Sequence, residues 1–409
     1  MVVVGGGVVG IACARELALR GASVVVLERD RIGYGCSFGN AGWLTPSQAL
    51  PLANPNLLLK SFRWMLDPES PLYIQPRLDP AFLRWLGGFL YAARRATFER
   101  GAQALLELCR VSVDLWEELA RRTGEPFGFE RQGLLAVYEK AASLAAARGG
   151  IELLARNGIR AEAWSADEVR TREPAVTGAQ VGAYFFPDDA HCEPYPAVRA
   201  LAAEAIAAGA KLCEQSELFG CAASLNGRRR LITTRGEIAA DRVVVATGSW
   251  SEEVGKSLGL RLPILGAKGY SMLLPRAEVH PKRSIYLIER KIAVNPHADS
   301  LRIAGTLELV RADDSINRRR LAVVLRGAQG MLALGDPPTV TEIWRGLRPC
   351  APDGMPLIGR ARGKGDIWIA TGHQMTGLKT ATGTGVLLAQ LMTGETPRFD
   401  PHPFRADRY

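Results

Sequence analysis

The sequence has no long apolar run. None of its segments reaches the about 18 uninterrupted apolar residues that a membrane-spanning helix needs. Hydrophobic residues at 47% and charged residues at 23% are typical of a soluble globular protein. A glycine-rich motif begins at Gly5, close to Met1, so we expect no signal peptide and a cytoplasmic protein.

The sequence is also poor in patterns that bind metals or form disulfides. Its seven cysteines include no C-x-x-C pair, and its five histidines show neither H-x-x-H nor H-E-x-x-H spacing. An odd number of cysteines without a signal peptide favours reduced thiols. Scattered histidines do not favour a metal site. We therefore expect free cysteines and no bound metal.

Positive charge is present in modest excess. The formal net charge is +9, and residues 228–230 and 318–320 are runs of arginine. These runs suit solvated loops, which is the simpler interpretation, or a peripheral contact with the anionic inner face of a membrane. No RNA-binding signature accompanies them, so we expect no nucleic-acid partner.

The first thirty residues contain a dinucleotide-binding fingerprint. A β-branched run leads into Gly5-x-Gly7-x-x-Gly10, a helical pattern follows to about Arg20, and a second apolar run ends at Glu28. The glycines allow a tight turn, a close approach to a pyrophosphate and close packing of the helix on the sheet. The helix N-terminus attracts phosphate, and the acid suits a ribose diol. The expected contacts are Gly5, Gly7, Val8, Val9, Gly10 and Glu28.

Two later stretches favour contact with a flat ligand. Residues 33–46 are small, polar and glycine-rich, which suits backbone lying against a ligand, although a plain surface loop has the same composition. In residues 241–250 a buried strand opens into a turn of small residues, where backbone can again reach a cofactor.

The remaining patterns predict the rest of the architecture. Helices are expected at 81–99, 102–122 and 196–208 and from near Gly377, strands at 132–138, 211–214 and 367–370, and a strand that ends in a turn at 181–190. Candidate strands at 264–274, 284–296 and 301–310 follow one another without helices, which indicates an antiparallel sheet.

At 409 residues the chain exceeds the usual size of a single core, so two domains are expected. The pattern predicts an α/β fold, in which a discontinuous Rossmann-type nucleotide-binding domain is interrupted by an α+β domain on a mixed or antiparallel sheet. We assign residues 1–46, 188–262 and 343–409 to the first domain, and 47–187 and 263–342 to the second. The cleft between two such domains is a natural ligand site.

Four stretches in this order carry a family resemblance. They are the fingerprint with Glu28-Arg29, Ser37-x-x-Asn40-Ala41-Gly42, Val245-Ala246-Thr247-Gly248, and the pair Gly346-Leu347-Arg348-Pro349-x-x-Pro352-Asp353-Gly354 with Gly372-His373-x-x-Thr376-Gly377. The chain resembles the FAD-dependent D-amino acid oxidase superfamily, and within it the small, catalytic subunits of bacterial D-amino acid dehydrogenases. Hydroxyproline dehydrogenases, glycine oxidase and sarcosine oxidase are similar relatives.

The resemblance implies FAD rather than NAD. It places Glu28 and Arg29 at the ADP ribose and Leu218 at the adenine. It places Ser37, Asn40, Ala41, Gly42 and Leu44 at the pyrophosphate or flavin, Thr247 and Gly248 on the other side, and Gly372, Thr376, Gly377, Leu378, Lys379 and Thr380 at the pyrimidine end. Sarcosine oxidase attaches FAD through a cysteine at the position of Gly346, so we expect non-covalent FAD.

The resemblance also implies substrate contacts. Arg348 matches the residue that holds the carboxylate in glycine oxidase, and an arginine fork suits a carboxylate; a surface arginine is the alternative. Lys379 resembles the lysine of sarcosine oxidase that contacts the substrate carboxylate, or it neutralises reduced flavin. His373 is expected to line the flavin pocket, with a role as catalytic base less favoured. Tyr270 offers a pocket hydroxyl or is a core tyrosine.

The predicted reaction is oxidative deamination of a free D-amino acid to the 2-oxo acid and ammonia, by hydride transfer to flavin N5. Electrons then pass to a quinone or another carrier. D-amino acid dehydrogenases usually have a neutral residue at the position of Lys379, which leaves the substrate open. A D-proline or hydroxyproline dehydrogenase and a glycine- or sarcosine-type oxidase are alternatives. The FAD domain of a tRNA-modifying enzyme and a non-catalytic flavoprotein subunit are more distant ones.

Overall fold

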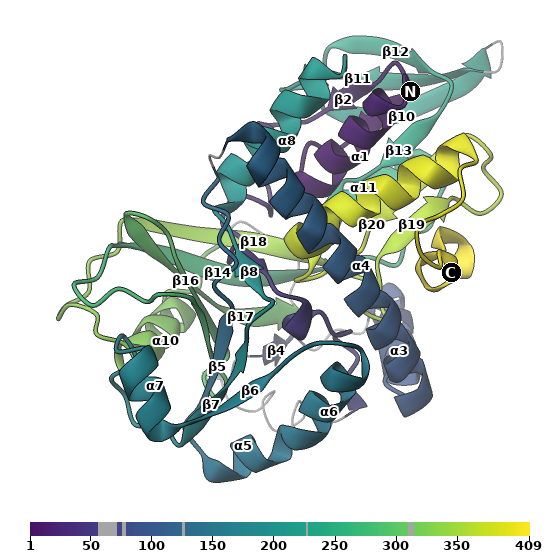
Figure 1. Cartoon of the computed structure of the whole chain (residues 1–409). Helices are drawn as coiled ribbons and strands as arrows, with labels where there is room; N and C mark the ends of the chain where they lie inside the picture. The colour runs from purple at the N-terminus through teal and green to yellow at the C-terminus, as the bar shows by residue number, and fades with distance from the viewer. Residues whose placement is uncertain (56–71, 76–78, 125–126, 226–227, 310–314) are drawn as a thin grey trace.

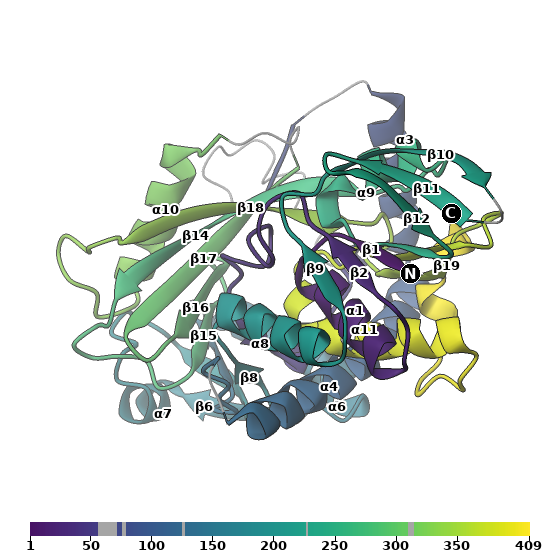
Figure 2. The ribbon, with the colours of Figure 1, turned by 90° about the horizontal axis from the view of Figure 1, so that it is seen from above.

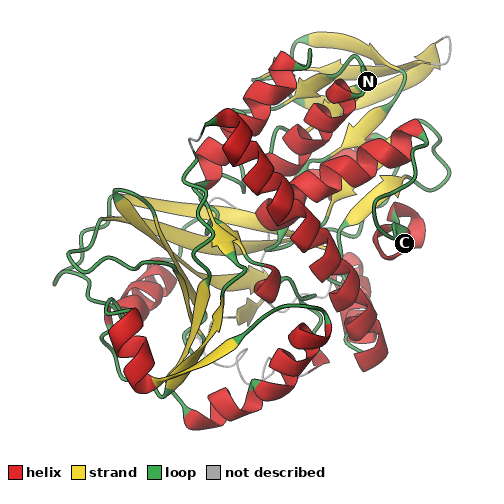
Figure 3. Ribbon diagram, in the orientation of Figure 1, coloured by secondary structure: helices red, strands yellow, loops and turns green. Residues whose placement is uncertain are grey.

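The computed structural model describes residues 1–55, 72–75, 79–124, 127–225, 228–309 and 315–409. Two sheets organise these residues, and the long helix α4 (Arg95–Thr123) runs beside both of them (Figure 1). Figure 3 shows helices covering the outer side of each sheet. Among the described residues, no helix combines the length and the apolar character needed to cross a membrane.

The first sheet is the predicted nucleotide-binding sheet. Within the described residues it has six strands in the order β19-β20-β13-β1-β2-β9. Their bounds are β1 Val2–Val4, β2 Val25–Leu27, β9 Lys211–Cys213, β13 Val243–Val245, β19 Leu357–Arg360 and β20 Ile367–Thr371. The strand β1 pairs in parallel with β2 and β13. All three valines of β1 are buried, as expected for a central parallel strand covered on both faces.

Helices cover one face of this sheet and a small sheet covers the other (Figure 2). The helices are α1 (Val8–Leu19), α8 (Pro194–Ala207) and α11 (Gly377–Thr393). On the opposite face lie β10 (Leu218–Leu225), β11 (Arg228–Thr233), β12 (Gly236–Ala240) and α9 (Ser251–Ser257). Their apolar side chains pack against Val2, Val4 and Val243 in one core cluster. This three-layer arrangement confirms the predicted Rossmann-type fold.

The second sheet is mixed. In the described part of the chain its order is β18-β14-β17-β16-β15-β5-β7-β6, with β4 beside β17. The bounds are β4 Leu72–Ile74, β5 Leu134–Tyr138, β6 Glu162–Ser165, β7 Gly182–Phe186, β14 Leu265–Pro275, β15 Ser284–Leu287, β16 Ile292–Pro296, β17 Ser300–Leu309 and β18 Glu342–Cys350. From β18 to β15 neighbouring strands are antiparallel, whereas β15 pairs in parallel with β5.

Short helices surround the second sheet. They are α5 (Ala141–Ala146), α6 (Arg148–Arg156), α7 (Ala166–Arg172) and α10 (Arg318–Gln329). Side chains of α7 and α10 pack into the core cluster formed by β5, β14, β15, β16 and β17. A further short pair, β3 (Trp43–Leu44) with β8 (Ala190–His191), links the loop after the fingerprint to residues before α8.

Three predicted boundaries are wrong. Residues 284–296 form two strands, because the chain turns back at Lys291, which has a left-handed φ of 55°. The helix α3 spans Pro80–Ala92, and the break before α4 falls at Arg94, which has an extended conformation, rather than at Gly101. The helix α8 begins at Pro194, not at Pro196; proline suits either position within a first helical turn, so composition does not select between them.

Candidate active site

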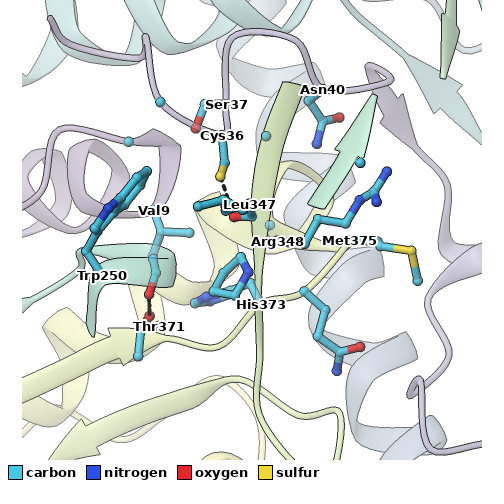
Figure 4. A pocket seen from close by; sticks show the side chains of 18 of the residues that line it. Val9, Cys36, Ser37, Asn40, Trp250, Leu347, Arg348, Thr371, His373 and Met375 are labelled. Carbon is cyan, nitrogen blue, oxygen red and sulfur yellow. Dashed lines mark hydrogen bonds between the residues drawn. The ribbon is translucent and has the colours of Figure 1, made fainter. Parts of the chain in front are cut away.

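One large cavity connects the two sheets. Its volume is about 1370 Å³, and its wall runs from the turn between β1 and α1 to the start of α11 and across β14, β17 and β18. Common ligand pockets have volumes of roughly 300–1,000 Å³, so this cavity has room for a dinucleotide and a small substrate. Figure 4 shows part of its wall, including Arg348, His373 and Trp250.

The fingerprint forms one end of the cavity. Gly5, Gly7, Val8 and Val9 line it, and α1 begins at Val8 with no acidic residue in its first turn. Gly10 does not line the cavity, because it lies against the turn itself. A Cβ added at Gly10 would overlap the carbonyl oxygen of Gly5, so this glycine permits helix and strand to approach each other.

Glu28 directly follows β2, and its carboxylate binds the glycine turn. Its Oε2 accepts a hydrogen bond from the N–H of Gly6 at 2.7 Å, and its Oε1 accepts one from Asp30 at 2.9 Å. The next residue, Arg29, places its guanidinium 4.0 Å from the ring centroid of Trp250. The cavity is lined by Glu28, Arg29, Asp30 and Trp250, but not by Gly6. The carboxylate is therefore fixed where a sugar hydroxyl can meet it.

The loop after β2 covers the start of α1. The Oγ of Ser37 accepts a hydrogen bond from the N–H of Val8 at 3.0 Å, and Asn40 Oδ1 accepts one from Gly42 at 2.9 Å. Ser37, Asn40 and Ala41 line the cavity, whereas Gly42 and Leu44 do not. Gly42 O accepts a hydrogen bond from the N–H of Cys192, and Leu44 pairs with Ala190 in β8. Gly42 and Leu44 thus anchor the loop.

Residues from the other side complete this wall. Leu218, Thr247 and Gly248 line the cavity, as do Gly377, Leu378 and Lys379 at the start of α11. Gly372, Thr376 and Thr380 do not line it. The Oγ1 of Thr376 donates to the carbonyl oxygen of His373, and that of Thr380 donates to Thr376. The indole N–H of buried Trp116 on α4 donates to Leu378 O at 3.0 Å and so fixes the first turn of α11.

The Lys379 ammonium is engaged by the protein. Its Nζ donates to Oγ1 of Thr45 at 2.6 Å and to the carbonyl oxygen of Thr45 at 3.2 Å. Burial lowers the pKa of Lys379, while Cys109 and Asp189 act in the opposite direction. Burial raises the pKa of nearby Asp189 to about 7, against the opposing hydrogen bonds from Ser47. This geometry turns Lys379 toward Thr45.

His373 and Tyr270 also line the cavity. Nε2 of His373 lies 3.0 Å from Oγ1 of Thr384, and burial lowers the pKa of His373 to about 3. A histidine with that pKa is neutral at physiological pH and is a weak base. The hydroxyl of Tyr270 accepts a hydrogen bond from the N–H of Asn317 at 3.2 Å, and burial raises its pKa to about 12.

Arg348 is placed differently from the other polar residues. Its Nη1 donates to the carbonyl oxygen of Thr306 at 2.7 Å, and burial lowers its pKa. Among the described residues no carboxylate pairs with it, although the side chain is half-buried in the cavity wall. A guanidinium with open donors in such a place favours binding of an anionic ligand group.

Several wall residues were not predicted from the sequence. On α3 they include Trp85, Leu86 and Phe89; Trp85 donates its indole N–H to Cys350 O at 2.9 Å and stacks on Phe89. Helical spacing is the same for a core and for a cavity wall, so the sequence does not show that Trp85 faces the cavity. Trp344 and Thr306 are further examples. Trp344 and Thr306 occupy strands whose pairing the sequence does not specify.

The comparison with family models decides the family. The model described as FAD dependent oxidoreductase, abbreviated DAO, matches residues 1–391. The chain belongs to this FAD-dependent family. It is 33% identical over 417 residues to a D-amino acid dehydrogenase of Paramagnetospirillum magneticum, covering 100% of this chain and 98% of the relative. It is 32% identical over 414 residues to a D-amino-acid oxidase of Bradyrhizobium diazoefficiens, with coverage of 100% and 98%.

A solved structure of glycine oxidase from Geobacillus kaustophilus has the same fold, with a TM-score of 0.78 and 25% identity, covering 100% of this chain and 98% of that one. The residues of this DAO-family cavity fit FAD. The close approach at Gly10, the Glu28 carboxylate beside the glycine turn and the cavity volume all suit a dinucleotide. The predicted FAD dependence and fold class are confirmed.

Proposed function

We propose that this protein oxidises a free amino acid at its α-carbon, with D-amino acids as the first candidates. The observation that carries the proposal is the Arg348 guanidinium, which lies in the cavity wall without a carboxylate partner among the described residues. An α-carboxylate is the group that an arginine fork recognises best. The names of the two curated relatives, a D-amino acid dehydrogenase and a D-amino-acid oxidase, favour the D series.

FAD, when bound, supplies the two-electron acceptor that takes a hydride from the α-carbon. The α-nitrogen loses a proton and forms a double bond to this carbon, and water then hydrolyses the imino acid to the 2-oxo acid and ammonia. Arg348 would hold the carboxylate and so orient the C–H bond. His373, neutral and bonded to Thr384, would shape the pocket wall rather than remove the proton.

The cavity wall also favours a class of side chain. Trp85, Leu86 and Phe89 of α3 and Leu307 and Leu309 of β17 line one region of the cavity. Such a wall gains free energy by burying an apolar or aromatic side chain, roughly 25 cal/mol per Å² of apolar surface. We therefore propose apolar D-amino acids ahead of glycine or sarcosine.

Non-covalent binding of FAD is supported at Gly346. A Cβ added there would overlap the indole of Trp344, so the position has no room for a cysteine that could attach the cofactor. We also propose that a quinone or another carrier accepts the electrons. The helix α3 lines the cavity and exposes Leu83, Leu90 and Tyr91, an apolar surface that suits a peripheral membrane contact. Binding to anionic vesicles tests that contact.

The central experiment mixes the holoenzyme anaerobically with a panel of D- and L-amino acids and follows flavin absorbance. We expect bleaching by apolar D-amino acids. If no amino acid bleaches the flavin, the proposed function is wrong. Dye reduction compared with hydrogen peroxide formation then separates a dehydrogenase from an oxidase.

Replacement of Arg348 tests the carboxylate site directly. Arg348→Ala is expected to raise KM for the amino acid about tenfold to a hundredfold, since it removes charge-assisted hydrogen bonds, while FAD content stays unchanged. Arg345→Ala is the matched control, because Arg345 lies on the same strand and also lines the cavity. A larger KM increase in Arg345→Ala would place the carboxylate at Arg345 instead.

A further inference from the structure

Three neighbouring strands meet at the Arg348 side chain. Arg348 on β18 pairs directly with Ala267 on β14, and β14 in turn pairs with β17. The guanidinium nevertheless bonds to the carbonyl oxygen of Thr306, which belongs to β17. The side chain therefore crosses the central strand β14 to reach the strand beyond it.

Gly269 provides the passage across β14. A Cβ added at this position would overlap the guanidinium carbon and both terminal nitrogens of Arg348. Gly266, on the same strand, differs: a Cβ there would meet Ser249 and Leu347 at ordinary van der Waals distances of 3.6 and 3.7 Å. The Arg348 side chain therefore occupies the space that a Cβ at Gly269 would fill.

Thr306 sits at the end of that path in an unusual conformation. Between Gly305, opposite Tyr270, and Glu308, opposite Lys268, β17 has one residue more than β14. This is a β-bulge, a feature that re-aims backbone groups near active sites. Thr306 has φ of 62°, a left-handed value that is rare for a β-branched residue and costs about 1–3 kcal/mol.

The strain is concentrated around the cavity. Of the four described non-glycine residues with positive φ, Gln215, Lys291, Thr306 and Gln374, all but Gln215 line it. The Oγ1 atom of Thr306 is also buried without a hydrogen-bond partner among the described residues. An energetically unfavourable conformation persists when surrounding structure or function requires it. In this conformation the carbonyl oxygen of Thr306 accepts a hydrogen bond from Arg348.

We infer that Gly269 and Thr306 are positioning residues that hold the Arg348 guanidinium in one orientation for the substrate carboxylate. The inference rests on the proposed function. A free arginine side chain loses up to about 2 kcal/mol of conformational entropy when it becomes fixed. The bond to Thr306 fixes it before substrate arrives, and the gap at Gly269 keeps its path open. The two residues thereby orient the open donors of the fork.

The test compares two glycine-to-alanine variants of the holoenzyme. Gly269→Ala is expected to raise KM for the best amino acid of the panel about tenfold to a hundredfold, because the guanidinium that binds the carboxylate is displaced. Gly266→Ala is expected to keep the wild-type KM. The inhibition constant of acetate, a carboxylate without an amine, should rise with KM in Gly269→Ala alone. The Tm should change little in both variants. At Gly269 the added methyl group displaces only the guanidinium of Arg348, which is the end of a flexible side chain.

A double-mutant cycle shows whether Gly269 acts through Arg348. In an Arg348→Ala background, Gly269→Ala is expected to add less than about a twofold effect, because the group it displaces is absent. Independent, multiplying effects would overturn the inference. Arg348→Lys provides a second variant: an ammonium keeps the charge but not the planar fork, so its KM should approach that of Arg348→Ala. A wild-type KM in Arg348→Lys would also overturn the inference.

The outcomes separate the inference from the proposed function. If Arg348→Ala raises KM while Gly269→Ala behaves like Gly266→Ala, the positioning role is wrong and the carboxylate site stands. If amino acids bleach the flavin but Arg348→Ala leaves KM unchanged, the positioning role and the carboxylate site at Arg348 are both wrong, whereas amino acid oxidation stands.

Discussion

Replacing Glu28 with alanine is expected to raise the Kd for FAD about 10-fold to 150-fold. The Glu28 carboxylate lines the cavity beside the glycine turn. In our assignment it accepts hydrogen bonds from the ADP ribose, as the acid of this fingerprint does. The variant tests whether the first motif of the sequence binds the cofactor.

The magnitude follows from the hydrogen bonds that Glu28 makes. A hydrogen bond to a charged group contributes about 1.5–3 kcal/mol, and loss of one to the ribose corresponds to a Kd roughly 10 to 150 times higher. The carboxylate also holds the N–H of Gly6 at 2.7 Å and that of Asp30 at 2.9 Å. The Gly6 bond is partly buried, so the apoprotein should also lose about 1.5–3 kcal/mol of unfolding free energy.

Fluorescence titration of the apoprotein with FAD measures the Kd, and thermal unfolding without FAD measures the second effect. Glu253→Ala is the control, because Glu253 is an exposed carboxylate on the wall of the same cavity. It removes the same charge without disturbing the glycine turn. An equal change in Kd for both variants would refute the ribose assignment and leave only a general electrostatic effect.

Two further predictions concern stability. Burial raises the pKa of Asp189 to about 7 from an ordinary value near 3.8, so the folded protein holds a proton there that the unfolded chain has lost. The contribution of Asp189 to stability therefore falls as pH rises from about 4 to 7. Asp189→Asn, which still accepts from Ser47, should flatten this decline in a series of Tm measurements; an unchanged slope would contradict it. Thr306→Gly should raise the unfolding free energy by about 1 kcal/mol, because glycine adopts positive φ without strain; a lower Tm would show that Thr306 is not strained.

The sequence alone determined the nucleotide-binding half of this protein. Gly5, Gly7 and Gly10 act through backbone conformation, and Glu28 acts through a carboxylate at the end of the same β-α-β unit, so their spacing fixes their arrangement. The family resemblance added FAD and Arg348. Both the fold class and the FAD dependence are confirmed by the sheet order and the family match. The domain limits and the individual contacts remain predictions.

The tertiary structure alone decided how the substrate end is built. Thr306 and Gly269 come together with Arg348 because of the strand order β18-β14-β17 and the bulge in β17, and neither is encoded by local spacing. Helical periodicity shows that Trp85 lies on an apolar face of a helix, but it does not show that this face lines the cavity. The sequence assigns Lys379 to the substrate carboxylate or to reduced flavin, but only the fold shows that its ammonium bonds to Thr45, 334 residues away in the chain. Local motifs specify backbone shape, whereas side-chain partners depend on which distant strands the fold places side by side.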